Sequence, residues 1–295
     1  MKEPIITVVG SFAVGMTLRA DRMPVFGETL MASEFNLGPG GKGSNQAVAA
    51  ARLGAKAHFV GLIGEDPLGK IALDLYAAEG VDTNHLVVSK EFPTGVGFII
   101  VNPEGKNGIL LDMGANKWID RTFVERAEPL IARSNVVLSV LEIPVEAACT
   151  AMELGRKHGV RTLLNPAPAA PIPKEAFRSI DLLTPNETEL RILLGLEPDD
   201  QTPTAELASR LQREYGTTVV VTRGEHGSLL QDEQDRQEFP AVPVDVVDTT
   251  GAGDAFTAAL AVAWAEGKDI ATAIKFASCS GALACTRLGV IPSCD

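Results

Sequence analysis

Short apolar runs alternate with helix-like segments along most of the chain. The first run, Ile5 to Gly10, is rich in β-branched residues and is closed by glycine, as is typical of a buried strand. Residues 43–53 follow with helical character, and Gly54 ends them. This alternation of strand and helix predicts an α/β fold with a mostly parallel sheet and crossover helices. Later strands are expected at 57–62, 136–140, 160–164, 181–183 and 218–222, and later helices at 67–79, 145–158, 187–194, 205–215, 251–266 and 270–286.

Two segments depart from this rhythm. Residues 12–37 and 94–113 contain short alternating apolar runs with Gly and Pro, and they lack helical periodicity. We expect both to form antiparallel strands of one small sheet that stands off the main one. Such a flap would cover a site and exclude water from it. The alternative is that both segments are ordinary surface excursions.

The run D-T-T-G-A-G-D, Asp248 to Asp254, carries the strongest chemical signal. It follows an apolar stretch at 242–247, which we expect to be a strand, and it leads into the helix expected at 251–266. A Gly-rich turn entering a helix directs free backbone N–H groups and the positive end of the helix dipole at one point, which suits a phosphate. A carboxylate beside that point is able to take a hydroxyl proton while the amides neutralise a transferring phosphoryl group. The alternative is that Asp254 is simply favoured by the dipole and that the glycines only shape the turn.

A second glycine-rich segment, G-P-G-G-K-G-S-N-Q at 38–46, opens the helix at 43–53. Glycine allows a close approach of the backbone, and Asn45 offers both a donor and an acceptor to a neutral polyhydroxy ligand. The spacing matches neither a Walker A loop nor a dinucleotide-binding loop. This segment is weak evidence by itself.

Polar motifs also follow several predicted strands, where open α/β sheets bind ligands. N-P-A-P begins at Asn165, T-P-N-E-T-E spans 184–189, and T-R-G-E-H-G spans 222–227. Glu142 lies just past the strand at 136–140. The alternatives are that Thr184 or Asn186 only caps the following helix and that Glu142 is an ordinary surface residue.

Charge and composition narrow the possible partners. The 295 residues carry a net charge of −12, which disfavours nucleic acid and anionic membranes but leaves an anionic small substrate possible. The four cysteines show no C-x-x-C pair, so free thiols in a reducing compartment are expected rather than a zinc site. The N-terminus lacks a signal-peptide core, and no run approaches the roughly 18–20 apolar residues of a membrane helix. We therefore expect a soluble cytoplasmic protein.

In their order along the chain, the five motifs together are specific. Their combination resembles the ribokinase-like (PfkB) carbohydrate kinases, and among them the ribokinases, over residues 5–293. The resemblance implies a three-layer α/β/α sandwich with a mostly parallel central sheet and a small β-sheet lid, in one domain over 1–295. It also implies ATP-dependent phosphorylation of a hydroxyl group on a sugar or related polyhydroxy compound, with Mg²⁺ as the companion of ATP.

The resemblance also assigns expected roles to individual residues. Asp254 matches the catalytic base, and the anion hole for the γ-phosphate matches Gly251, Ala252 and Gly253. The sugar pocket matches Gly41, Lys42, Gly43, Asn45 and Glu142, together with Asp254. The nucleotide site matches Asn186 near the phosphates and magnesium, Thr222, Arg223, Gly224, Glu225, Gly227, Gly253, and Ser278 near the adenine.

Ribokinases in this family also look potassium-activated through a loop beside the anion hole. The matching positions, which mostly offer backbone carbonyls, are Asp248, Thr250, Ala284, Arg287, Gly289 and Ser293. Oxygen ligands suit a hard cation, whose effect would be to fix the shape of the anion hole. The two flap segments resemble the lid through which ribokinases pair, so the resemblance implies a homodimer.

One departure concerns the substrate. Family members that phosphorylate ribose carry an Asn and an Asp where this chain has Ala13 and Gly15. Losing two sugar contacts, each worth about 1 kcal/mol, argues against ordinary ribose recognition. The extra room would admit a bulkier sugar, or one whose charge is met by Lys42 or Arg19. The alternatives are a nucleoside or phosphosugar kinase of the same superfamily, and a non-catalytic sugar- or nucleotide-binding regulator. The intact D-T-T-G-A-G-D run argues against the regulator.

Overall fold

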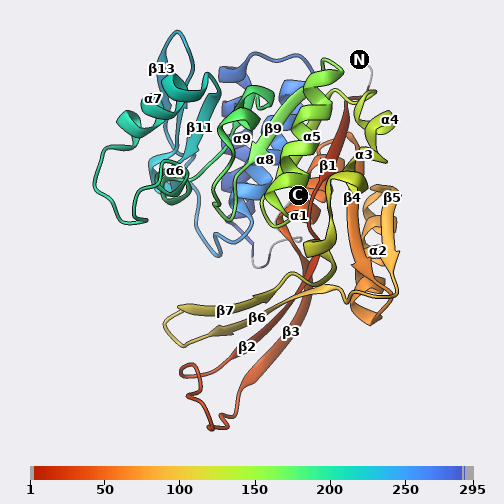
Figure 1. Ribbon diagram of the computed structural model, residues 1–295. Helices are drawn as coiled ribbons and strands as arrows, with labels where there is room; N and C mark the ends of the chain where they lie inside the picture. Colours follow the sequence, from red (N-terminus) through yellow and green to blue (C-terminus); the bar gives the residue numbers. More distant parts are fainter. Residues whose placement is uncertain (1–2, 288, 290–295) are drawn as a thin grey trace.

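The structure is a computed structural model that describes residues 3–287 and 289 (Figure 1). Its main element is a nine-stranded sheet in the order β13-β12-β11-β10-β9-β8-β1-β4-β5. Neighbouring strands from β11 to β5 are parallel, and β12 and β13 extend the sheet as antiparallel strands. The strands are β1 (Ile5–Val9), β4 (Lys56–Gly64), β5 (Asp82–Ser89), β8 (Val136–Val140), β9 (Arg161–Asn165), β10 (Leu182–Leu183), β11 (Thr218–Thr222), β12 (Ser228–Gln231) and β13 (Arg236–Phe239).

Helices cover both faces of this sheet, as the alternation of strands and helices predicted. One face packs against α1 (Lys42–Arg52), α2 (Pro67–Glu79), α8 (Ala252–Ala265) and α9 (Ile270–Ala284). The other packs against α3 (Arg121–Glu125), α4 (Glu128–Ile131), α5 (Val145–Lys157), α6 (Glu187–Leu193) and α7 (Thr204–Tyr215). Short 3₁₀ helices lie at Gly114–Trp118, Lys174–Ser179 and Gly224–His226.

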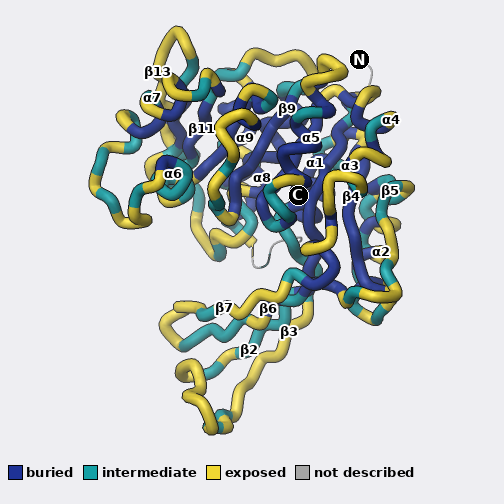
Figure 2. Tube along the Cα trace, viewed as in Figure 1, coloured by how far each residue is buried: buried dark blue, intermediate teal, exposed yellow. Residues whose placement is uncertain are grey.

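Each strand feeds two hydrophobic cores, because successive side chains point to opposite faces of a sheet. Val136 and Leu138 of β8 belong to the core beneath α1 and α8, whereas Val137 belongs to the core beneath α5. All residues of β8 are buried, and Figure 2 shows the main sheet as the buried centre of the molecule. The expected three-layer α/β/α sandwich is confirmed.

A second, four-stranded sheet projects from the main body (Figure 1). Its order is β3 (Ser33–Gly40), β2 (Ala13–Arg19), β6 (Gly95–Val101), β7 (Asn107–Asp112). The outer pairs are antiparallel as expected, but β2 and β6 pair in parallel, so the antiparallel expectation is wrong for the central pair. The cause is topological. β2 continues from β1, and β6 continues from β5. Because β1 and β5 run parallel and end at the same edge of the main sheet, β2 and β6 leave that edge in the same direction.

The expected strand at 242–247 is also absent, since the structure has irregular backbone there. Pro243 lacks a backbone donor, and Val246 and Val247 are 63% and 60% exposed. The segment is tied instead to the end of α9, where Val247 N donates to Cys285 O at 2.8 Å. Conversely, the sequence interpretation missed the two edge strands, β5 and β13, and the strand β12 beside β13.

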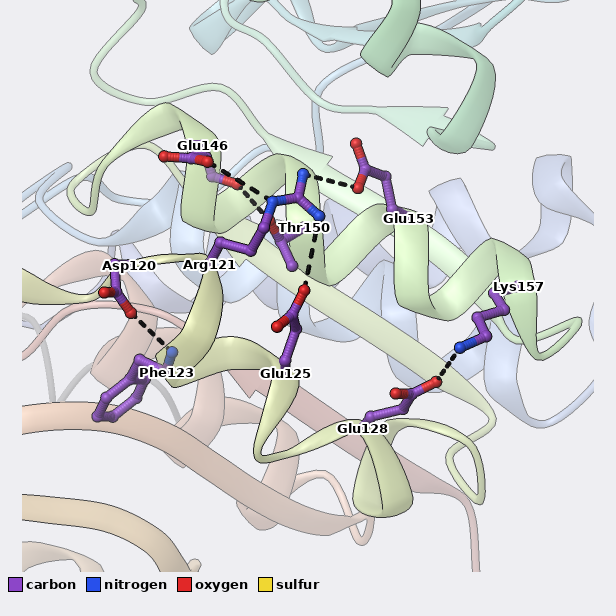
Figure 3. A network of polar contacts seen from close by, with 9 residues as sticks. All are labelled: Asp120, Arg121, Phe123, Glu125, Glu128, Glu146, Thr150, Glu153 and Lys157. Carbon is purple, nitrogen blue, oxygen red and sulfur yellow. Dashed lines mark hydrogen bonds and ion pairs between the residues drawn. The ribbon is translucent and has the colours of Figure 1, made fainter.

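Away from the strand ends, an ion-pair network joins α3 to α5 (Figure 3). Arg121 lies 3.0 Å from Glu153, 3.5 Å from Glu146 and 3.8 Å from Glu125. Lys157 at the end of α5 similarly pairs with Glu128 of α4 at 2.7 Å. In the part of the chain that the structure describes, no helix is both long and apolar enough to cross a membrane.

Candidate active site

Asp254 lies in the first turn of α8 and is only 4% exposed. The helix begins after Gly251, whose left-handed φ of 82° is readily adopted by glycine. Among the described residues, the backbone N–H groups of Gly253 and Asp254 have no hydrogen-bond partner. A Cβ added to Gly253 would meet no atom within 4 Å, so open space lies beside these amides. The turn therefore has the free donors and the room that an anion requires.

The start of α1 lies against Ser11 and the end of the first strand because glycines permit it. A Cβ on Gly41 would lie 2.8 Å from Ala13 N, and one on Gly43 would lie 2.5 Å from Ser11 N. Gly41 also has a φ of 90°. This close approach points the first turn of α1 at α8. The Asn45 amide donates through Nδ2 to Asp254 Oδ2 at 2.8 Å.

Lys42 and Glu142 share a half-buried polar cluster with Ser11. Glu142 Oε2 accepts hydrogen bonds from Ser11 Oγ at 2.5 Å and from Lys42 N at 2.7 Å. Burial raises the pKa of the Glu142 carboxyl, although these hydrogen bonds act in the opposite direction. The negative charge of Asp254 raises the pKa of the Lys42 ammonium, with Glu142 and Glu189 adding to it and burial opposing it. Lys42 is thus a cation held among carboxylates, and the surface alternative for Glu142 is wrong.

The carboxyl ends of β9 and β10 bring further polar groups to the same place. Asn165 Nδ2 donates to the backbone oxygen of Thr184 at 2.7 Å, and Gln46 Nε2 donates to Asn165 Oδ1 at 3.0 Å. Gln46 Nε2 also donates to Asp254 Oδ1 at 3.0 Å. A connected set of side chains therefore runs from the end of the sheet to the carboxylate of Asp254.

Asn186 caps α6, as one alternative proposed. Its Oδ1 accepts from Glu189 N at 2.8 Å, while Glu189 Oε2 accepts from Asn186 N at 2.8 Å, which forms a capping box. Thr184 does not cap this helix; its hydroxyl lies 3.4 Å from that of Thr257. Burial raises the pKa of the Glu189 carboxyl. Asn186 also pairs with Thr222 through an isolated bridge, so two of the expected nucleotide positions are neighbours.

The segment from Thr222 to Gly227 forms a tight turn at the end of β11. Gly224 and Gly227 have φ values of 55° and 77°, and a Cβ on Gly227 would lie 2.0 Å from Phe239 O. Arg223 donates to Glu238 of β13 at 2.9 Å, while Glu225 is exposed. No hydrogen bond or ion pair within the described ranges joins this turn directly to Asp254.

The residues expected around potassium are partly assembled. Asp248 Oδ1 accepts from Thr250 N at 2.9 Å and from its hydroxyl at 2.7 Å, and Asp248 Oδ2 accepts from Gly289 N at 3.1 Å. Ala284 ends α9 immediately before Cys285, whose backbone oxygen accepts from Asp248 N at 3.2 Å. Arg287 follows in the same segment, and Ser293 lies outside the described residues. Ser278 is apart from this cluster and donates to Ile274 O within α9 at 2.9 Å.

Three contributors to the site were not assigned from the sequence: Gln46, Asn165 and Glu189. All lie inside motifs that were recognised, and Gln46 and Asn165 stand beside apolar stretches of buried elements. A polar side chain that is buried in this way needs a hydrogen-bond partner, and this requirement was the signal in the sequence that could have indicated a role for both residues. The partner itself was not readable, because Gln46 and Asn165 are 119 residues apart.

Comparison with known proteins identifies the family of the chain. Residues 5–295 match the family described as "pfkB family carbohydrate kinase". The chain is 37% identical over 284 residues to a ribokinase of Haemophilus influenzae, covering 96% of this chain and 93% of that protein. It is 35% identical over 285 residues to a deoxyribokinase of Salmonella typhi, again covering 96% and 93%. The structure of Arabidopsis thaliana ribokinase complexed with ribose and ATP superposes with a TM-score of 0.92 at 33% identity, covering 99% of this chain and 95% of that one. The chain belongs to the pfkB family of carbohydrate kinases.

Proposed function

We propose that this chain transfers the γ-phosphoryl group of ATP to a hydroxyl group of a sugar or related polyhydroxy compound, with Asp254 as the general base. The observation that carries the proposal is the buried carboxylate of Asp254 beside free amides at the start of α8. A carboxylate at this position repels any anion that the amides bind, which is unfavourable unless the carboxylate has a role in the reaction. Phosphoryl transfer to an alcohol gives it one, because the carboxylate takes the hydroxyl proton while the amides bind the phosphoryl group. The ribokinase and deoxyribokinase relatives perform reactions of this class by name.

In the proposed reaction, the substrate hydroxyl gives its proton to Asp254 while its oxygen attacks the γ-phosphorus in line. The bond between the γ-phosphorus and the bridging oxygen breaks, and ADP leaves. The free amides of Gly253 and Asp254 stabilise charge on the transferring group, together with those of Gly251 and of Ala252, whose N–H also donates to Thr249 O at 3.2 Å. The positive charge of the Lys42 ammonium interacts with Asp254. Asn45 orients Asp254 through its Nδ2, and its buried Oδ1 has no hydrogen-bond partner among the described residues.

We place ATP over the ends of β10 and β11, near Asn186, the Thr222–Gly227 turn and Ser278. The described residues contain no group of three His, Cys, Asp or Glu side chains placed to hold a metal. That suits Mg²⁺, which is commonly held by one or two carboxylates, water and the substrate phosphates. The oxygen-bearing side chains of Asn186 and Glu189 would hold it. When bound, Mg²⁺ supplies neutralisation of the phosphate charge.

A potassium site around Asp248 is a further part of the proposal. Asp248 joins the turn at Thr250 to the segment at Gly289, and its carboxylate, the Thr250 hydroxyl and the Cys285 carbonyl are oxygen groups of the kind that a hard cation prefers. Ala284, Arg287 and Ser293 are the remaining candidate contributors. We expect KCl to raise both kcat and the melting temperature relative to equal NaCl, and Asp248→Ala to abolish both differences. Equal effects of the two salts on the native protein would refute the site.

We propose that the small sheet acts as a lid. Leu111 of β7 lines a hollow of about 260 Å³ together with Glu142, Ile143 and Pro168. Leu111 pairs with Gly97, and Gly97 pairs with Gly15, so these positions share one face of the sheet. That face is therefore turned toward the polar cluster at Glu142.

The pairing registers of the lid strands also indicate which side chains face the substrate. Ala13 lies two residues before Gly15 and shares its face, so neither position offers a polar side chain to the Glu142 side. The lid then contacts the substrate through apolar groups and leaves space beside Glu142. This arrangement favours a deoxygenated or bulkier polyhydroxy compound over ribose, and nucleosides and phosphosugars remain the alternative substrates. ADP release should be compared for ribose, 2-deoxyribose, hexoses, polyols, nucleosides and phosphosugars. Preference for ribose over all other compounds would refute this substrate assignment.

The opposite face of the lid supports a homodimer. Paired positions place four apolar residues in one row across all four strands, and three of them are exposed: Leu37, Phe98 and Leu110, with Met16 between Leu37 and Phe98. A contiguous apolar row of this kind marks an association surface. We expect a dimer by light scattering and a monomer for Phe98→Asp; a native monomer at micromolar concentration would refute the pairing. We also propose a cytoplasmic location, consistent with the free thiols of Cys149, Cys279 and Cys285.

A non-catalytic regulator is the second candidate from another class. The buried Asp254 carboxylate beside the free amides of α8 argues against it, because a protein that only binds ligands has no need of a base at that position. The discriminating observation is ADP release above the rate of uncatalysed ATP hydrolysis with any compound of the panel. Binding of ATP with no turnover on any compound would favour the regulator.

A further inference from the structure

Two neighbouring side chains of α1 each donate a hydrogen bond to the carboxylate of Asp254, one to each oxygen. Asn45 donates to Oδ2 at 2.8 Å, and Gln46 donates to Oδ1 at 3.0 Å. The same Nε2 of Gln46 donates its other hydrogen to Asn165 Oδ1, also at 3.0 Å. Gln46 is fully buried, and Asn165 is 7% exposed. We propose that Gln46, braced by Asn165, is the positioning residue that fixes the carboxylate of Asp254 in the geometry needed to accept the substrate proton. This inference rests on the proposed role of Asp254 as the base.

The backbone determines the direction of this chain of hydrogen bonds. The carbonyl oxygen of Thr184 can only accept, so Asn165 must present its NH₂ group to it at 2.7 Å. Asn165 therefore presents its Oδ1 to Gln46. The amide nitrogen of Gln46 then lies between two acceptors, and a flipped amide would place Oε1 against both of them. One orientation of each amide makes all of these hydrogen bonds, and it leaves Gln46 Oε1 and Asn45 Oδ1 without a partner among the described residues.

The arrangement connects Asp254 to the sheet as well as to a helix. Asn165 ends β9, and Thr184 follows β10, so the hydrogen bonds of Gln46 connect the carboxylate on α8 to two strands of the rigid core. The hydrogen bond from Asn45 alone would connect it only to α1. A carboxylate has about four lone-pair positions, so each oxygen that accepts one bond from α1 retains another for a substrate hydroxyl. Gln46 thus orients the carboxylate without blocking it.

Removing the Gln46 amide should affect the chemical step far more than binding. A base displaced by about 1 Å can lower the rate on the order of 10²-fold. We expect Gln46→Met, which is similar in length but has no donor, to lower kcat by about 10- to 100-fold. KM for the sugar and for ATP should stay within about threefold, because Gln46 is not placed in contact with either substrate.

The matched control is Ser44→Ala. Ser44 lies in the same turn of α1 and is equally buried, but its hydroxyl faces that of Tyr76 and makes no hydrogen bond to Asp254 or Asn165. Its kcat should remain near native. The increase in melting temperature on addition of Mg-ATP establishes for each variant that the chain is folded and binds nucleotide. Gln46→Met with native kcat and a normal ATP response would overturn the proposal.

Gln46→Glu provides a test that a merely structural role would not satisfy. When protonated, the new carboxyl group can still donate one hydrogen bond to Asp254; when ionised, it has no donor and repels Asp254. The ratio of variant to native kcat should therefore fall as the pH rises, and a flat ratio near one would overturn the proposal even if Gln46→Met fails to fold. Asp254→Asn, measured in parallel, separates the two claims. Loss of kcat in Asp254→Asn with native kcat in both Gln46 variants refutes only the positioning role, whereas native kcat in Asp254→Asn refutes the proposed base itself.

Discussion

Gly43 should be intolerant of a single added methyl group, although helix propensity predicts the opposite. Gly43 is the second residue of α1, and alanine in a helix is favoured over glycine by about 1 kcal/mol. A Cβ at this position would lie 2.5 Å from Ser11 N, 2.7 Å from Gly10 Cα and 2.8 Å from Gly10 C. All three are backbone atoms beside the end of β1, so no side-chain rotation can relieve the contact.

The helix must then move away from the strand, and because only backbone atoms are met we expect the upper end of the usual overpacking cost, about 3 kcal/mol. The gain in propensity offsets about 1 kcal/mol of it, which leaves about 2 kcal/mol. At about 2–4 °C per kcal/mol, we expect Gly43→Ala to lower the melting temperature by roughly 4–8 °C. Activity should fall as well, because α1 carries Asn45 and Gln46 and its displacement moves both from Asp254.

Thermal unfolding followed by fluorescence, together with kcat on the best substrate, measures both effects. Gly38→Ala is the control for stability, since it lies in the same glycine-rich segment but its added Cβ would meet nothing within 4 Å. Its melting temperature should remain within about 1 °C of native. A Gly43→Ala protein that melts at or above the native temperature would show that helix propensity outweighs packing here and would refute the reasoning.

Two further predictions concern electrostatics. Burial raises the pKa of Glu142 in the folded chain, so its contribution to stability is present below the unfolded pKa and is lost as the pH rises through the folded pKa. Glu142→Gln, whose Oε1 can still accept from Ser11 and Lys42, should therefore melt above the native protein at about pH 7–8 and converge with it near pH 4; a constant difference would contradict the assignment. Arg121→Met should cost about 1 kcal/mol or less in a denaturant titration, because the Arg121 side chain is 44% exposed and its ion pairs are therefore screened by water. A loss of several kcal/mol would show that the network is a cooperative structural support of α3 and α5.

The main architecture was readable from the sequence because its signals are local. Apolar β-branched runs marked the central strands, and glycines with left-handed φ, such as Gly80 and Gly216, ended helices where expected. The Val136–Val140 and Thr218–Thr222 strands have the expected bounds, since both are buried and apolar. Edge strands such as Arg236–Phe239 were missed because their exposed residues are polar and give no apolar run.

Features that depend on distant parts of the chain were not readable. The parallel pairing of β2 with β6 follows from where β1 and β5 end, which no local pattern records. The apolar run at 242–247 looked like a strand, but it is an exposed segment held by the end of α9. The motifs assigned Asp254 and Asn45 to the site and contained Asn165 and Gln46 without assigning them to it. The hydrogen bonds that join these four residues form only when α1, α8 and the sheet pack together.

The most direct test of the account is the turnover of Asp254→Asn beside the native protein. ADP release should be measured with Mg-ATP and KCl on the polyhydroxy compound that the native chain phosphorylates fastest. Asparagine keeps the shape of the side chain and its position at the start of α8 but cannot take a proton, so kcat should fall by about 10²–10⁴-fold while the ATP-induced rise in melting temperature is retained. A variant that folds, binds ATP and turns over at a near-native rate would remove Asp254 from the role of base and contradict the central claim.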